Sequence, residues 1–177
     1  MSAASGTLPA TVGLVGPSGS GKTTLIERLL PFLAQRGLRV GVAKHHGHPI
    51  ELDTEGKDTW RFRRAGASTT ALVGGDQLAV FGAGAAALPF ETLLATFYLG
   101  CELVLVEGFR AADQPSIVVA RAPLPPDWSR PSRPIALAAD RPDRFEATDP
   151  GWRGLPRFGL DDLPALAVFV AARVGRR

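Results

Sequence analysis

The sequence predicts an α/β fold with a doubly wound, mostly parallel sheet, flanking helices and a small β-hairpin extension. Three observations predict it: strand-like and helical segments alternate, a glycine-rich turn joins the first strand to a helix, and a later strand is apolar throughout. The 177 residues, 45% hydrophobic and 21% charged, suit a single domain over 1–177 with a sizeable core. Residues 1–10 are expected to form a flexible lead-in.

The N-terminal segment predicts a strand at 8–15, a helix, and a second strand at 38–43. Pro31 predicts a kink in this helix, which is expected to end near Gly37. The three elements favour a right-handed crossover between parallel neighbours. Helical spacing predicts one buried stripe, made of Leu25, Ile26, Leu29, Leu30 and Leu33.

The rest of the chain predicts a hairpin, further strands and three helices. Residues 74–76 form a turn signal between two short strands, and 103–106 is apolar throughout, as in a strand covered on both faces. Prolines make 122–134 an irregular surface loop. The expected elements are a helix at 57–65, strands at 69–73 and 78–81, a helix at 90–98, strands at 103–106, 117–120 and 135–138, and a last helix capped by Asp161 or Asp162.

Residues 16–23 match the phosphate-binding loop of P-loop NTPases. Glycines there let the backbone approach a phosphate closely and adopt angles that other residues rarely adopt. Lys22 is expected to reach the β- and γ-phosphates, and the Thr23 hydroxyl to bind Mg²⁺. The expected nucleotide-binding residues of this segment are Gly16, Ser18, Gly19, Ser20, Gly21, Lys22, Thr23 and Thr24.

Glu107 directly follows the apolar strand, at the end of a parallel sheet where such folds bind ligands. It is expected to coordinate Mg²⁺ or order water, in the place where an aspartate is more usual. Lys22 and Glu107 are therefore the candidate catalytic residues. The alternative for Glu107 is an acid exposed to solvent at the end of a strand.

Lys44, His45, His46 and His48 follow the second strand as a cluster that contains every histidine of the chain. A metal site, neutral hydrogen-bonding histidines in a nucleotide or pterin site, and a solvated loop are three open interpretations. Lys44, His45 and His46 are kept as ligand or partner candidates.

A charged segment runs from Asp53 to Arg64 and by default forms the solvated face of a short helix, most clearly at Arg63. Arg61 and Arg64, three residues apart, share a helix face and are candidates for holding an anionic ligand or partner.

Asp140 follows the predicted strand at 135–138. Phosphate-loop GTPases have an aspartate in such a place, which accepts hydrogen bonds from guanine and disfavours adenine. The Asn-Lys pair that usually precedes it is absent, so the residues leave the choice between GTP and ATP open.

Several segments together resemble the MobB family, the adaptors of molybdopterin-guanine dinucleotide biosynthesis. The resemblance covers about residues 11 to 140, and its most specific parts are the segments from Gly56 to Ala67 and Glu107-Gly-Phe. The matching stretches are 16–23, Lys44-His45-His46, 53–59, Arg61, 64–67 and 106–110, with Arg110 in the place of the commoner lysine.

The resemblance implies a GTP-binding protein with weak hydrolysis that dimerises and assists the attachment of GMP to molybdopterin. The implied cofactors are GTP and Mg²⁺, with Asp53 and Glu107 near the metal. The implied partner is a molybdopterin guanylyltransferase of MobA type, with molybdopterin itself as a second candidate. No ligand is implied for the histidines, because their spacing differs from that of relatives.

The composition bears on three classes of protein: nucleic-acid-binding, membrane and disulfide-bonded proteins. A net charge of +3 is too small to indicate nucleic acid, no stretch is apolar enough for a membrane helix, and one cysteine cannot form an internal disulfide, so a cytoplasmic protein is expected. Two alternatives share the same phosphate loop: a small-molecule or nucleotide kinase, and a metallochaperone GTPase with Cys101 and the histidines as metal ligands.

Overall fold

The computed structural model describes residues 7–47, 50–82, 88–108, 113–121, 124, 128–129, 131–145 and 154–174. His48, Phe109, Arg110, most of the expected lead-in and much of the proline-rich loop lie outside these ranges. The chain divides into two compact units, each described by itself: a sheet unit, residues 1–45 and 94–177, and a hairpin unit, residues 46–93. The prediction of a single domain stays a prediction.

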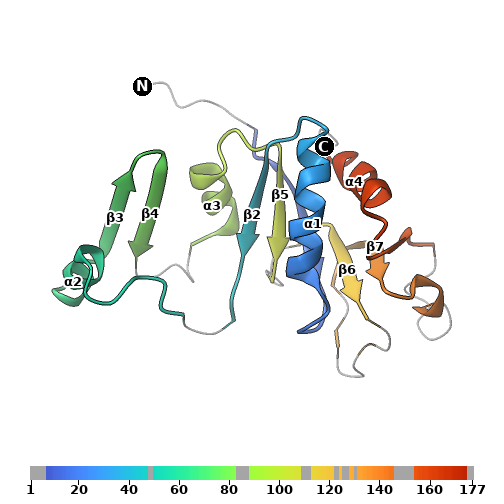
Figure 1. Cartoon of the computed structure of the whole chain (residues 1–177), viewed down its shortest axis with the longest axis horizontal. Helices are drawn as coiled ribbons and strands as arrows, with labels where there is room; N and C mark the ends of the chain where they lie inside the picture. Colours follow the sequence, from blue (N-terminus) through green and yellow to red (C-terminus); the bar gives the residue numbers. More distant parts are fainter. Residues whose placement is uncertain are drawn as a thin grey trace. The chain divides into compact units, whose positions relative to one another are not determined.

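The sheet unit contains six parallel strands in the order β2-β5-β1-β6-β7-β8 (Figure 1). Strands extend outward on both sides of β1, which pairs with β5 on one side and with β6 on the other. The predicted α/β fold is therefore confirmed. The strands are β1 (Ala10–Val15), β2 (Val40–Lys44), β5 (Leu103–Glu107), β6 (Ser116–Ala120), β7 (Pro134–Ala139) and β8 (Arg157–Gly159).

The expectation that β1 and β2 are neighbours is wrong, because β5 lies between them and pairs with both. Every residue of β5 is buried, whereas in β2 only Ala43 is buried and the other four residues are half-buried or exposed. The strand with the most apolar surface thus occupies the interior of the sheet, and the strand that contains Gly41 and Lys44 forms its edge.

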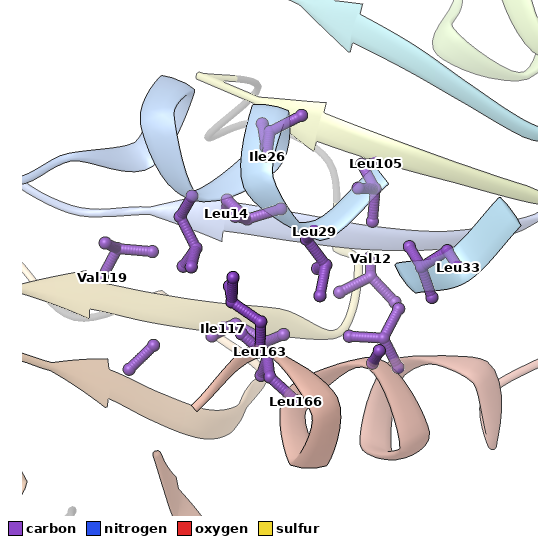
Figure 2. Close-up of a cluster of buried hydrophobic side chains, with 14 of the residues drawn as sticks. Val12, Leu14, Ile26, Leu29, Leu33, Leu105, Ile117, Val119, Leu163 and Leu166 are labelled. Carbon is purple, nitrogen blue, oxygen red and sulfur yellow. The ribbon is translucent and has the colours of Figure 1, made fainter. Parts of the chain in front are cut away.

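Two helices pack on one face of this sheet and close the main core (Figure 2). Helix α1 (Lys22–Ala34) buries Leu25, Ile26, Leu29 and Leu33, and the predicted Leu30 packs partly buried against the same cluster. Helix α4 (Leu163–Ala171) adds Leu163, Leu166 and Val170. Its N-cap is Asp162, which makes no side-chain capping bond. The core therefore fixes the loop at the start of α1 against the carboxyl ends of the central strands.

The opposite face of the sheet has a smaller apolar cluster. Val15, Val118 and Leu137 belong to it, and Leu124 and Trp128 pack against it partly buried. Hydrophobic side chains thus cover both faces of the central strands, which explains their continuous apolar sequence.

The hairpin unit contains helix α2 (Asp58–Arg64) and the antiparallel strands β3 (Thr69–Gly74) and β4 (Gln77–Gly82). The predicted hairpin is confirmed, with its turn at Gly75, which has a φ of 60°. Helix α3 (Phe90–Phe97) follows and buries Leu94.

Two short elements were not expected, β8 and the 3-10 helix η2 (Pro142–Phe145). The last strand is three residues long and adds a sixth strand beside β7. Among the described residues, no helix combines the length and apolar character needed to cross a membrane.

Candidate nucleotide-binding site

The glycine-rich loop lies between the end of β1 and the start of α1, as predicted. The Lys22 ammonium donates to the carbonyl oxygens of Gly16 and Pro17, at 3.1 and 2.7 Å, and so lies within its own loop. Ser20 is 4% exposed, and its buried hydroxyl has no hydrogen-bond partner. The loop therefore holds a cation and a buried polar group beside the first turn of a helix, the arrangement that binds phosphate.

Two different physical reasons require the glycines of this loop. Gly19 and Gly21 have φ values of 73° and 94°, which side chains with a Cβ rarely adopt. A Cβ on Gly16 would instead overlap the backbone carbonyl of Val119 in β6. Gly19 and Gly21 are thus required for their positive φ angles, and Gly16 is required because β6 passes close to it.

Thr23 and Glu107 meet at the carboxyl ends of the central strands. The Thr23 hydroxyl donates to both carboxylate oxygens of Glu107, at 3.1 and 2.9 Å, although 84 residues separate them. The Glu107 side chain is 10% exposed, so the alternative of a solvent-exposed acid is wrong. Hydroxyl and carboxylate oxygens are ligands that suit Mg²⁺, and the residues therefore fit that metal.

Lys44 lies beside this pair because β2 and β5 are paired in parallel with Lys44 opposite Glu107. Its ammonium is 3.4 Å from a Glu107 carboxylate oxygen and 3.4 Å from the Thr23 hydroxyl. The Lys44 side chain is 52% exposed, so its end also reaches solvent.

The chain after β5 turns sharply at Gly108, which has a φ of 85°. A Cβ at Gly108 would overlap the carbonyl oxygen of His45, and the His45 N–H donates to the Glu107 carbonyl at 2.8 Å. The first residues after β2 and β5, His45 and Gly108, therefore lie side by side. In the part of the chain that the structure describes, no group of three histidine, cysteine, aspartate or glutamate residues could hold a metal ion.

A pocket of about 290 Å³ opens beside the loop. Gly21 and Thr24 line it from the start of α1, and the exposed Asp140 lines it from the end of β7. Asp140 accepts a hydrogen bond from the Arg141 N–H at 2.9 Å. Further lining residues that the sequence did not assign to this site are Arg121, Gly159, Leu160 and Asp161. The last three end or follow the unexpected strand β8.

Arg28 also lines this pocket, and its guanidinium forms an ion pair of 2.8 Å with Asp161. The Asp161 side chain is 89% exposed, so the pair lies at the surface. Asp161 therefore bonds to α1 rather than capping α4.

In the hairpin unit, Asp53 is a buried carboxylate with partners from its own surroundings. One oxygen accepts hydrogen bonds from the Thr59 hydroxyl at 2.8 Å and the Thr54 N–H at 3.0 Å. The other oxygen lies 3.6 Å from the Arg63 guanidinium, which is also 5.9 Å from the centre of the Phe81 ring. Arg63 is therefore only partly solvated, with 36% of its side chain exposed, because β4 and Asp53 supply partners that its position in the sequence does not reveal.

Arg61 and Arg64 remain on the exposed part of α2. Arg61 lies 3.8 Å from Asp58, one turn earlier, and Arg64 lies over the Trp60 ring at 5.6 Å. Both guanidinium groups keep access to solvent, where an anionic group could approach.

The comparisons with known proteins agree with this geometry. Residues 11–140 match the family described as MobB, molybdopterin guanine dinucleotide synthesis protein B. The chain is 40% identical over 111 residues, 62% of each chain, to the molybdopterin-guanine dinucleotide biosynthesis adapter protein of Haemophilus influenzae. It is 34% identical over 166 residues, 92% of each chain, to the probable molybdopterin-guanine dinucleotide biosynthesis adapter protein of Bacillus subtilis.

Among solved structures, the crystal structure of Bacillus subtilis MobB matches with a TM-score of 0.73 and 31% sequence identity. That match covers 95% of this chain and 99% of the other.

Proposed function

The chain belongs to the MobB family, and from this we propose that it is a GTP-binding adapter that assists the attachment of GMP to molybdopterin. The names of the relatives from Haemophilus influenzae and Bacillus subtilis support the adapter role. The observation that carries the nucleotide part is the bond from Thr23, at the end of the phosphate loop, to the buried Glu107. The relatives do not favour the kinase or metallochaperone alternatives.

In this proposal the loop holds the phosphates of the nucleotide. Backbone N–H groups of 16–23 and the N-terminal end of α1 attract the anion, and the Lys22 ammonium leaves its two carbonyl partners to contact the β- and γ-phosphates. The buried Ser20 hydroxyl without a partner supports a polar ligand at the loop.

We propose that Mg²⁺ is held by Thr23 and Glu107. Asp53 is kept as a separate proposal for a metal ligand, which rests on the family resemblance alone. The metal would supply charge to stabilise the phosphates. Glu107 then has the second role of orienting water for slow hydrolysis. The sequence shows no obvious catalytic base, which supports a protein that retains GTP more than it consumes it.

The pocket beside Gly21 is proposed to hold the nucleobase. A carboxylate at Asp140 accepts hydrogen bonds from guanine N1–H and the 2-amino group, whereas adenine presents an acceptor at N1. The arrangement supports GTP over ATP because an unpaired acceptor facing a carboxylate is unfavourable.

Equilibrium binding of GTP and of ATP, each with and without Mg²⁺, tests the proposal. We expect GTP to bind about tenfold or more tightly than ATP, since hydrogen bonds to a charged group are at stake. The variant Asp140→Asn should lose most of this preference, whereas the control Asp143→Asn on η2 should keep it. A preference for ATP, or binding of neither nucleotide, would refute the proposal.

The partner is proposed to be a molybdopterin guanylyltransferase of MobA type, with molybdopterin as a further ligand. Exposed cationic and imidazole groups that suit an anionic ligand or partner support this choice: His45, His46, Arg61 and Arg64. Capture of the purified transferase on immobilised protein loaded with GTP would test it, with the nucleotide-free protein as the control.

A homodimer in the cytoplasm is the last part of the proposal. One face of the hairpin, formed by Ala71, Val73, Leu78 and Val80, is apolar and exposed, which supports association with a second copy. The chain has a single cysteine, Cys101, which cannot form an internal disulfide, and this supports a reducing compartment such as the cytoplasm.

A further inference from the structure

Lys44 is the one site candidate whose role the nucleotide proposal leaves unexplained. Its ammonium lies 3.4 Å from the Glu107 carboxylate and 3.4 Å from the hydroxyl of Thr23, the two groups proposed to bind Mg²⁺. The sheet fixes this contact, because Lys44 and Glu107 lie opposite one another in the register of β2 and β5.

The hydroxyl of Thr23 and the ammonium of Lys44 both stabilise the carboxylate of Glu107. A carboxylate that is 10% exposed is costly unless a cation or hydrogen-bond donor compensates its lost hydration. Thr23 donates to both Glu107 oxygens, and Lys44 adds the positive charge. The trio is thus neutral and complete without a metal ion.

Mg²⁺ cannot join this arrangement without a rearrangement of Lys44. Magnesium requires oxygen ligands at short distances in a near-octahedral shell, and an ammonium at hydrogen-bond range from the same oxygens repels a divalent cation. Lysine has a flexible four-carbon stem and this one is half-exposed, so its end can withdraw into water.

We propose that Lys44 is the counter-ion of Glu107 in the nucleotide-free protein and competes with Mg²⁺ for the Thr23–Glu107 pair. This inference rests on the proposed nucleotide function. Lys44 acts through Glu107 and is therefore a positioning residue: it keeps the carboxylate against Thr23 and sets the Mg²⁺ concentration that the site requires. When Mg²⁺ and nucleotide bind, Mg²⁺ replaces the Lys44 ammonium beside the Glu107 carboxylate.

The test measures the Mg²⁺ concentration at half-maximal enhancement of binding of a fluorescent GTP analogue. The variant Lys44→Met keeps an apolar stem and removes the charge. Its midpoint should fall by about fivefold or more, the factor that corresponds to one unit-charge interaction at close range in water. Lys44→Arg keeps the charge and should stay at or above the wild-type midpoint. Arg36→Met, at the opposite end of α1 from the loop, is the control for net charge and should leave the midpoint unchanged.

Thermal unfolding without nucleotide gives a second readout. In EDTA the Lys44→Met variant should unfold at a lower temperature than wild type, because Glu107 loses its counter-ion, and Mg²⁺ alone should restore more stability to the variant than to wild type.

Three outcomes overturn the inference. An unchanged Mg²⁺ midpoint in Lys44→Met shows that Lys44 does not compete with the metal. Weaker nucleotide binding by Lys44→Met in EDTA shows that Lys44 contacts the phosphates instead. A wild-type protein that binds no nucleotide at all refutes the proposed function itself, which distinguishes that failure from the first two.

Discussion

Lys22 donates to two carbonyl groups of its own loop, and it belongs to neither hydrophobic core cluster. We predict that Lys22→Ala lowers affinity for GTP by about tenfold to a hundredfold, since a charge-assisted hydrogen bond to phosphate is lost. Binding is measured by titration calorimetry.

The melting temperature of Lys22→Ala should stay within a few degrees of wild type, because the change leaves no cavity. Affinity equal to that of wild type would contradict the role of the loop, and a large loss of stability would mean that Lys22 holds the loop together.

Single residues of the site differ in how far the sequence predicts them. Thr23 and Glu107 were expected to lie together, because a loop pattern and the end of an apolar strand locate them, and the structure brings them into hydrogen-bond contact. The partners of Arg63 were not predicted, because Asp53 and Phe81 lie on other segments of the hairpin unit. The sequence shows which side chains are charged. Their burial and their partners depend on residues that only the fold brings near them.

At the scale of elements, the end of α3 is tied to β2 through Tyr98. Its hydroxyl donates to the Val42 carbonyl at 2.8 Å, and its ring lies so close to Gly41 that a Cβ there would overlap it. Burial raises the pKa of the Tyr98 phenol above its ordinary 10.0, and the neighbouring Cys101 raises it further.

Tyr98 is the only tyrosine of the chain, so the rise in ultraviolet absorbance on alkaline titration reports on it alone. We predict a midpoint above 10.0 in the folded protein and near 10.0 in denaturant. Cys101→Ser should lower the folded midpoint partway, because the thiolate charge is gone. Equal midpoints in the folded and unfolded protein would contradict the prediction.

The sign of the effect on stability follows from this shift. The folded protein holds the phenolic proton to higher pH than the unfolded chain does. The contribution is complete below pH 10.0 and is lost as the pH rises through the folded pKa. Tyr98→Phe removes this part of the pH dependence.

Elements with a strong pattern were predicted well, and those without one were not. The strand β5 is apolar at four successive positions and the hairpin has a turn signal, so both could be located from sequence. The three residues of β8 contain a single large apolar side chain, Phe158, which gives no alternation to detect. The expectation that β1 and β2 are neighbours was wrong because strand order depends on competition for the interior of the sheet, which no local pattern records.

At the scale of the whole molecule, the exposed apolar face of the hairpin predicts association. Val73 and Leu78 are paired across the two strands and are 73% and 59% exposed. We predict that the protein has the mass of a dimer in solution and that Leu78→Lys yields monomers, because a charge in an apolar interface is costly. Light scattering coupled to gel filtration measures both.

Leu52→Lys is the matched control for this dimer. Leu52 is 73% exposed and belongs to the same unit, yet it lies outside the hairpin. It should leave the mass unchanged. A monomeric wild-type protein would refute the dimer outright.

The position of β5 between β1 and β2 affects when the site forms during synthesis. The first two strands leave the ribosome early, but each must wait for residues 103–107 before it acquires the partner that joins them. Thr23 likewise waits for Glu107, 84 residues further on. Long loops must close before such contacts form, so a nascent chain that ends before β5 holds the loop sequence without its completed pocket. We therefore expect the proposed nucleotide site to assemble late in translation.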